Sequence, residues 1–382
     1  MYYNKFKDLE LSALGLGCMR LPCIDGVDAN PDVPAVQEMV DYAIANGINY
    51  FDTAWGYHGG NSESVMGEVL SKHNRDDYYL ASKFPGYDLS SFNKIEEIFE
   101  KQLEKCKTDH FDFYLFHNVC EMNIDKYLDD STGLYDYLMK QKEAGRIRHL
   151  GFSCHGTYET MMRFLAKYGK DMEFCQIQLN YLDYEFQEAK LKVEELNNRG
   201  IPIWVMEGLR GGKLAKSCLG AEKILAQTRP EFTPVNWAFS FLESVPGVTM
   251  ILSGMSNLEQ LKQNVEFFDE KKELTDEELG ALITAAHFDI QANKDTVPCT
   301  ACQYCMSKCP QELEIPRILA LYNEHVYTEG GFLAPMAVAG WDDDKKPTAC
   351  IGCGACAAVC PQQIDIPGIM TKFSDLLAKA EF

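Results

Sequence analysis

Hydrophobic and polar positions follow two alternating patterns along most of the chain, up to about residue 270. Short apolar runs typical of buried strands begin near Leu14, Ile48, Tyr78, Phe111, Ile147, Phe174, Ile201 and Val248. Runs with helical spacing follow near residues 35, 62, 92, 132, 157, 187, 233 and 257. A short hairpin is expected before them, over residues 3–6 and 9–11. Eight strand–helix units in succession predict an α/β fold, a (β/α)8 TIM barrel.

A doubly wound parallel sheet is the alternative to this barrel. Its dinucleotide-binding fingerprint, G-x-G-x-x-G, opens none of the predicted helices. The segment from Gly15 to Arg20 begins like that fingerprint and lacks its last glycine. We therefore favour the barrel, in which active sites are built where the strands end.

Polar residues stand at the ends of seven predicted strands. They are Asp52, Lys83, His117, Ser153, Gln178 with Asn180, Glu207, and Ser253 with Gly254. Tyr57 follows Asp52 in a glycine-containing loop. An Asp, a Tyr, a Lys and a His delivered to one face of a barrel can move protons. We expect these four residues to reduce a carbonyl group.

Tyr57 is the member of this set suited to give a proton to a carbonyl oxygen. An unperturbed tyrosine has a pKa of about 10, and a lysine ammonium about 4 Å away stabilises the phenolate by roughly 4 kcal/mol. We expect Lys83 to lower the pKa of Tyr57 in this way, with Asp52 fixing Lys83 in place. His117 is expected to orient the substrate oxygen. The structural alternative is an aromatic ring packed in a loop beside a buried Asp–Lys pair.

The stretch Phe51-Asp52-Thr53-Ala54, followed by Tyr57, Ser62-Glu63 and Gly67, resembles the signature of the aldo-keto reductases. The resemblance covers residues 1 to about 270 and includes residues 151–153, 176–181 and 254–256 with Asn264. It implies that Asp52, Tyr57, Lys83 and His117 form a catalytic tetrad. It also implies a nicotinamide dinucleotide, NADP or NAD, extended over the barrel mouth. The residues expected to hold it are Ser153, His155, Gln178, Gly208, Arg210, Gly212, Gly254, Ser256, Gln260 and Asn264.

The sequence departs from the family pattern at two places. Cys154 stands where an Asn usually follows the carboxamide-binding Ser153, and we expect His155 to replace that Asn. Many family members place a Lys and an Arg over the 2′-phosphate of NADP, and the matching positions here are Gly254 and Gln260. Arg210 would compensate in part, so the sequence leaves the choice between NAD and NADP open.

The composition narrows the partners of the protein. The net charge of −21 argues against binding to nucleic acid, whose phosphates are held by Lys and Arg. No apolar run reaches the length of a membrane span, and no apolar core of a signal peptide follows the first residues. We expect a cytoplasmic protein that acts on a small-molecule carbonyl substrate, without a membrane or nucleic-acid partner.

Eight of the 15 cysteines form a duplicated motif near the end of the chain. Cys299, Cys302, Cys305 and Cys309 recur 51 residues later as Cys350, Cys353, Cys356 and Cys360, with Pro after each run. This is the spacing of bacterial ferredoxins, in which the fourth cysteine of each run binds the other cluster. We assign one [4Fe–4S] cluster to Cys299, Cys302, Cys305 and Cys360, and a second to Cys350, Cys353, Cys356 and Cys309. Zinc is the alternative, but it usually takes two cysteine pairs.

The segment between the two cysteine runs is longer than in a minimal ferredoxin and contains helical patterns. We therefore expect a small, mainly helical ferredoxin-like domain over residues 291–382, after a barrel domain over residues 1–290. A capping box at Thr275 and Glu278 predicts the helix that links them.

Three arrangements of the two domains remain open at this stage. The first is a carbonyl reductase whose clusters are structural or shape the substrate mouth. The second is a redox enzyme in which the clusters exchange single electrons with a redox partner protein, a flavin or the bound substrate. The third is a non-catalytic electron-transfer or sensor protein. The complete tetrad favours the first.

Overall fold

The computed structural model describes residues 1–186, 189–217, 219–292, 295–299, 302–328, 330–331 and 333–380. The chain forms two compact units. The first contains residues 1–215 and 232–279, and the second contains residues 216–231 and 280–382. Within the described ranges, no helix is both long and apolar enough to cross a lipid bilayer.

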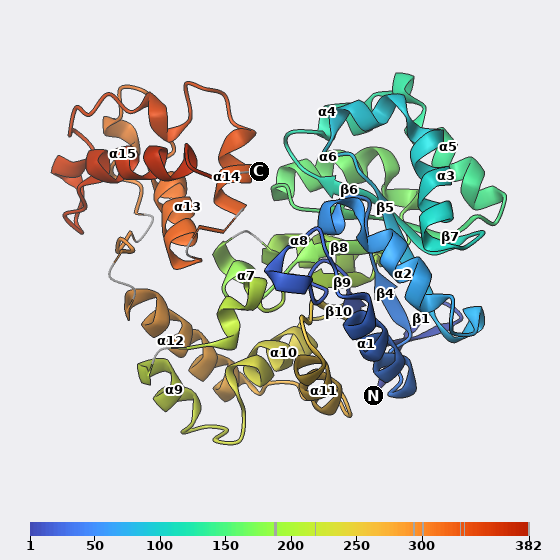
Figure 1. Ribbon diagram of the computed structural model, residues 1–382. Coiled ribbons are helices and arrows are strands. Elements are labelled where there is room, and N and C mark those ends of the chain that lie inside the picture. The colour runs from blue at the N-terminus through green and yellow to red at the C-terminus, as the bar shows by residue number, and fades with distance from the viewer. Residues whose placement is uncertain are drawn as a thin grey trace. The chain divides into compact units, whose positions relative to one another are not determined.

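Eight parallel strands of the first unit close into a barrel (Figure 1). They are β3 (Leu14–Gly17), β4 (Tyr50–Asp52), β5 (Tyr79–Phe84), β6 (Phe111–Val119), β7 (Ile147–Cys154), β8 (Cys175–Gln178), β9 (Ile203–Met206) and β10 (Val248–Ser253). Each pairs with its neighbours in sequence, and β10 closes the ring against β3. The predicted (β/α)8 barrel is confirmed, and the doubly wound sheet is wrong.

Helices of the first unit surround these strands (Figure 1). They are α1 (Val33–Ala45), α2 (Ser62–Leu70), α3 (Ile95–Cys106), α4 (Ile124–Leu128), α5 (Leu134–Glu143), α6 (Tyr158–Tyr168), α7 (Asp183–Phe186), α8 (Ala189–Arg199), α10 (Pro234–Ser244) and α11 (Leu258–Phe267). The predicted helix start near residue 187 lies outside the described residues. Side-chain caps fix the starts of some of these helices. At α10, for example, Thr233 and Asn236 form a reciprocal capping box.

The opening hairpin, β1 (Tyr3–Phe6) and β2 (Leu9–Ser12), closes one end of the barrel. The Phe6 ring lies 5.6 Å from Phe113 and 5.1 Å from Trp204, centroid to centroid, and both residues are near the starts of their strands. Since this end is filled with aromatic side chains, the opposite end, where the strands finish, is left for the site.

The helix α12 (Asp276–Ala292) begins with the predicted capping box. The backbone N–H of Thr275 donates to Glu278 at 2.7 Å, and the N–H of Glu278 donates to the Thr275 hydroxyl at 3.3 Å. The predicted helix is confirmed. The second unit contains α9 (Leu219–Leu225) together with the part of α12 from residue 280 onward.

The rest of the second unit is mainly helical, as predicted. It contains α13 (Ile315–Tyr327), α14 (Leu333–Ala339) and α15 (Ile366–Leu377). The duplication is visible in the backbone, because Glu312 and its equivalent Gln363 both have positive φ angles, 50° and 54°. It is also visible in the core: Tyr322 of α13 and its equivalent Phe373 of α15 are fully buried, with ring centroids 5.9 Å apart. The two copies therefore pack against each other around one small core.

Candidate active site and cluster sites

Asp52 and Lys83 form a buried ion pair at the ends of two adjacent strands. The Lys83 ammonium donates to Asp52 Oδ1 at 2.6 Å and to the Thr53 carbonyl at 2.8 Å. The Lys83 side chain is fully buried. Burial raises the pKa of Asp52, and the charge of Lys83 partly offsets this effect. The pairing of β4 with β5 thus places a fixed cation at the barrel mouth.

Tyr57 lies between this ion pair and His117. It begins the short turn η2 (Tyr57–Gly60), which follows β4. The Lys83 ammonium is 5.1 Å from the centroid of the Tyr57 ring, and the centroids of Tyr57 and His117 are 6.0 Å apart. The structure therefore brings all four predicted tetrad residues together.

The expectation that Lys83 lowers the pKa of Tyr57 is wrong for this structure. The pKa of Tyr57 is raised well above 10.0, first by burial and then by the charge of Asp52. The ammonium is already paired with Asp52, so its charge does not offset the effects of burial and of the Asp52 carboxylate on the phenol. Tyr57 is consequently a protonated phenol throughout the neutral range.

His117 is a neutral imidazole in this site. Burial lowers its pKa well below 6.5, and the charges of Lys83 and His155 act in the same direction. Its Nδ1 atom is buried and has no hydrogen-bond partner among the described residues. The ring of Tyr87, a residue that the sequence analysis did not single out, lies edge-on to His117 at 5.3 Å between centroids. Two tyrosines therefore flank the imidazole.

The residues predicted to hold the carboxamide lie at the ends of β7 and β8. The Ser153 hydroxyl accepts a hydrogen bond from the Asn118 backbone N–H at 2.8 Å. The Gln178 amide donates to Asp183 at 2.8 Å. His155 follows β7, and burial, with Lys192 and Lys83, lowers its pKa to about 4. All three groups are therefore uncharged polar side chains at neutral pH.

Asp183 organises the next part of the mouth and was missed by the sequence analysis. It is completely buried and accepts hydrogen bonds from both Gln178 and Asn180. It also pairs with Arg210 at 3.0 Å, and the Arg210 side chain is 5% exposed. The only sequence signal was its spacing after Asn180, which is equally typical of a helix start. Arg210 is therefore already paired with a buried carboxylate, and its expected contact with the phosphates stays a prediction.

The two predicted phosphate-binding segments follow β9 and β10. In the first, Gly208 is followed by η7 (Arg210–Ala215), where Gly212 has a φ of 89°, a conformation that favours glycine. In the second, the Ser256 N–H donates to Gln260 at 2.8 Å. The Asn264 amide donates to the Ser253 hydroxyl at 3.1 Å, and Gly254 is the next residue after Ser253. All of these residues belong to the end of the barrel where the strands finish.

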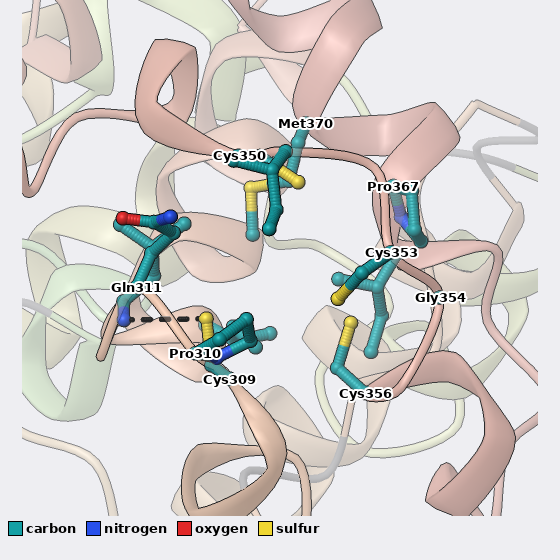
Figure 2. Close-up of a pocket in the computed structure, with 13 residues that line it drawn as sticks. Cys309, Pro310, Gln311, Cys350, Cys353, Gly354, Cys356, Pro367 and Met370 are labelled. Atoms are coloured by element: carbon teal, nitrogen blue, oxygen red, sulfur yellow. Dashed lines mark hydrogen bonds between the residues drawn. The ribbon is translucent and has the colours of Figure 1, made fainter.

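Two hollows in the second unit are each lined by four cysteines. One is lined by Cys309, Cys350, Cys353 and Cys356, and Figure 2 shows these side chains around it. The other is lined by Cys299, Cys302, Cys305 and Cys360. In each set, three cysteines come from one run and the fourth from the other. Four thiolates are the donor set of a [4Fe–4S] cluster, so both sets fit this group.

Comparison with known families agrees with this geometry. Residues 13–286 match the sequence model of the Aldo/keto reductase family. The chain belongs to the aldo/keto reductase family. Residues 298–364 match a second model, the 4Fe-4S dicluster domain. The protein is therefore an oxidoreductase of this family with a C-terminal iron–sulfur domain, the fused type expected from the sequence.

Curated relatives of this aldo/keto reductase are distant. The Uncharacterized oxidoreductase YqkF of Bacillus subtilis (strain 168) is 27% identical over 74% of this chain and 95% of its own length. The L-galactose dehydrogenase of Arabidopsis thaliana is 24% identical over 70% of this chain and 87% of its own length.

Solved structures show the same fold. The holo form of aldo-keto reductase AKR11C1 from Bacillus halodurans has a TM-score of 0.58 and 23% identity, covering 75% of this chain and 95% of its own. An aldo-keto reductase from Klebsiella pneumoniae, solved in complex with NADPH, has a TM-score of 0.57 and 20% identity, covering 74% and 95%.

Proposed function

We propose that the protein reduces a carbonyl group with NAD(P)H, with Tyr57 as the general acid. One observation carries this proposal: the Tyr57 ring lies against both the buried Lys83–Asp52 pair and His117 at the barrel mouth. A phenol beside a fixed cation and a neutral imidazole can donate a proton and have the resulting charge stabilised. A bound NAD(P)H would supply the hydride.

Tyr57 donates its proton to the carbonyl oxygen as that oxygen gains negative charge. Its raised pKa keeps the proton on the phenol until then, so the donor is ready at any neutral pH. Once the phenol has lost its proton, the nearby Lys83 ammonium stabilises the phenolate. Asp52 holds Lys83 in position throughout.

His117 orients the substrate. A neutral imidazole has one N–H donor and one acceptor nitrogen, and the low pKa of His117 keeps it in this form. Tyr87 packs against the imidazole from a second direction and restricts its movement. The substrate oxygen is thereby directed to the Tyr57 hydroxyl.

The strand-end residues support a nicotinamide dinucleotide at this mouth. Ser153, His155 and Gln178 are uncharged polar groups suited to a carboxamide. The segments around Gly208–Gly212 and Gly254–Asn264 are suited to the phosphates and the adenosine, and the Klebsiella relative of the same fold was solved with NADPH. We infer that the dinucleotide binds along this path, as NADP or NAD.

The test of the reductase proposal is the variant Tyr57→Phe. Loss of the proton donor is expected to lower kcat for NAD(P)H-dependent carbonyl reduction by about 100- to 10,000-fold. Tyr87→Phe is the matched control, because it removes a hydroxyl from the other ring against His117 and keeps the ring itself, so it should keep most of kcat. Equal activity of Tyr57→Phe and the wild type would overturn the proposal.

We further propose that the second unit binds two [4Fe–4S] clusters, one in each four-cysteine hollow. Each cluster would supply one-electron transfer. The boundary between a barrel domain and a cluster domain near residue 291 is part of this proposal. The third arrangement, without catalysis, is not retained, because the family is one of oxidoreductases.

A second function is supported by the same hollows. In it, the clusters exchange single electrons with a redox partner, a flavin or the bound substrate. Replacing Cys353 with Ser should then stop turnover while NAD(P)H binding is kept. Under the reductase proposal with structural clusters, a folded Cys353→Ser protein keeps its turnover. Measuring both quantities on one anaerobic preparation separates the two functions.

A further inference from the structure

Arg20 is a further cation at the barrel mouth. It follows β3 by three residues and its side chain is exposed. Among the residues that the structure describes, none forms a hydrogen bond or ion pair with it. Arg210, by contrast, is tied to Asp183 at 3.0 Å. Arg20 is thus available to a ligand, whereas Arg210 is engaged by the protein.

Packing against Gly254 fixes the course of the Arg20 side chain. A Cβ added to Gly254 would lie 3.2 Å from Arg20 Cβ and 3.3 Å from its Cγ and Cδ. A side chain at position 254 would therefore compete with the stem of Arg20 for the same space. The glycine at position 254 therefore leaves the space that the Arg20 side chain occupies.

The guanidinium of Arg20 reaches the other glycine-containing loop. One of its terminal nitrogens lies 3.1 Å from the point where a Cβ on Gly211 would be. Gly211 has a φ of 66° and belongs to η7. The arginine therefore extends from the segment after β10 to the loop after β9, the two segments proposed to hold the phosphates of the dinucleotide.

An acidic side chain also lies beside this loop. Glu207 Oε2 is 3.8 Å from the same point on Gly211, and no ion pair joins Glu207 to Arg20 within the described part of the chain. Burial raises the pKa of Glu207, and the charge of Arg20 opposes this rise. Arg20 and Glu207 thus influence each other electrostatically without a direct hydrogen bond between them in the described residues.

We propose that Arg20 binds a phosphate group of the nicotinamide dinucleotide and takes the place of the cations that Gly254 and Gln260 cannot provide. This inference rests on the proposed function, because it assumes a dinucleotide at the barrel mouth. A guanidinium offers several N–H donors in one plane and suits the oxygens of a phosphate.

The test is the affinity of the full-length, cluster-loaded protein for NADPH and NADH, followed by fluorescence titration. Arg20→Gln is expected to weaken binding on the order of 10- to 100-fold, the loss of a charge-assisted contact. Arg163→Gln is the matched control, because this arginine is exposed on α6 and pairs only with the exposed Asp125. It removes the same charge and should leave both affinities unchanged.

The two dinucleotides separate the two phosphate sources. An equal loss for NADPH and NADH assigns Arg20 to the pyrophosphate, and a loss confined to NADPH assigns it to the 2′-phosphate. Unchanged affinity of Arg20→Gln for both, while the wild type binds, overturns the inference. Failure of the wild type to bind either one overturns the proposed function instead.

Variants at position 254 test whether a cation there can replace Arg20. In an Arg20→Ala background, Gly254→Lys places a cation in the vacated space and should restore at least part of the lost affinity. Gly254→Ala alone crowds the stem of Arg20 and changes no charge, so it should weaken binding less than Arg20→Gln does. If Gly254→Ala loses as much affinity as Arg20→Gln, the space at position 254 rather than the charge of Arg20 governs binding, and the proposal is wrong.

Discussion

At the scale of single residues, the site depends on a buried pair of opposite charges beside Tyr57. Lys83 and Asp52 are both buried and lie 2.6 Å apart, so neither charge acts alone on its surroundings. The charge of Lys83 alone would lower the pKa of Tyr57, whereas in the complete site this pKa is raised. The cation becomes useful when the phenol loses its proton, since a new negative charge then appears beside it.

Substitutions at Lys83 and Asp52 can separate the contribution of this pair to stability from its contribution to catalysis. Lys83→Met leaves the Asp52 carboxylate buried without its partner and is expected to destabilise the fold by about 3–5 kcal/mol. Adding Asp52→Asn removes the unpaired charge, so the double variant should recover most of the free energy of unfolding while carbonyl reduction stays lost. Urea denaturation followed by tryptophan fluorescence measures the first quantity, and steady-state kinetics the second.

Lys72→Met serves as the control for this cycle, because Lys72 is exposed on the surface of the first unit. Its unfolding free energy should stay within about 0.5 kcal/mol of the wild type. A double variant as unstable as Lys83→Met would show that the charge of Asp52 is not what destabilises the single variant.

At the scale of elements, the close packing of helices α2 and α3 supports the strand that carries Lys83. Gly67 in α2 faces α3 so closely that a Cβ on it would lie 2.1 Å from the carbonyl oxygen of Lys105. The same two helices enclose a buried network in which Glu63 accepts hydrogen bonds from Ser82 and Gln102, each at 2.7 Å. Gln102 also donates to the carbonyl of Lys83 at 2.9 Å. The packing of α2 on α3 therefore positions the strand that carries the catalytic lysine.

Gly67→Ala is expected to destabilise the barrel by about 1–3 kcal/mol, because its new methyl group meets backbone atoms that can move only if the helices separate. Gly280→Ala is the matched control within α12, where an added Cβ has no atom of the described residues within 4 Å. That substitution should stabilise the protein by up to about 1 kcal/mol, through helix propensity alone. Thermal denaturation of both variants gives the comparison, and the same sign of shift in the two would contradict the packing argument.

At the scale of the whole molecule, the chain crosses between its two units more than once. After η7 it contributes residues 216–231 to the second unit, and it then returns to the barrel at residue 232. The loop proposed to bind phosphates is therefore continuous in the chain with the unit that holds the cysteine hollows. Within that unit, the duplication places the fourth cysteine of each run in the hollow of the other run.

Paired substitutions test this exchange of ligands. Cys302 and Cys360 lie in different runs and line one hollow, so the double variant to Ser should lose one cluster and keep about four of eight iron atoms per chain. Cys353 and Cys360 lie in the same run and line different hollows, so their double variant should lose both clusters. Iron and sulfide analysis after anaerobic purification measures this. The opposite result would mean that each run binds its own cluster.

Local sequence patterns were enough to predict the barrel, the strand ends that carry the tetrad and the two cysteine runs. Each of these depends on a local pattern: apolar runs end at a polar residue, and the cysteine spacing repeats after 51 residues. Strand starts were placed to within a few residues, as at Ile48, where β4 begins at Tyr50.

The fold in three dimensions was needed to establish which charged side chains lie close together. Asp183 is distant in sequence from Arg210, and Arg20 from Gly254, yet each pair lies side by side because the closed barrel brings its strand ends together. The pKa of Tyr57 likewise depends on its burial and on the charge of Asp52, and the order of the strands along the chain shows neither effect. Electrostatic effects depend on distance and burial in three dimensions, so they follow from the fold rather than from the spacing of residues.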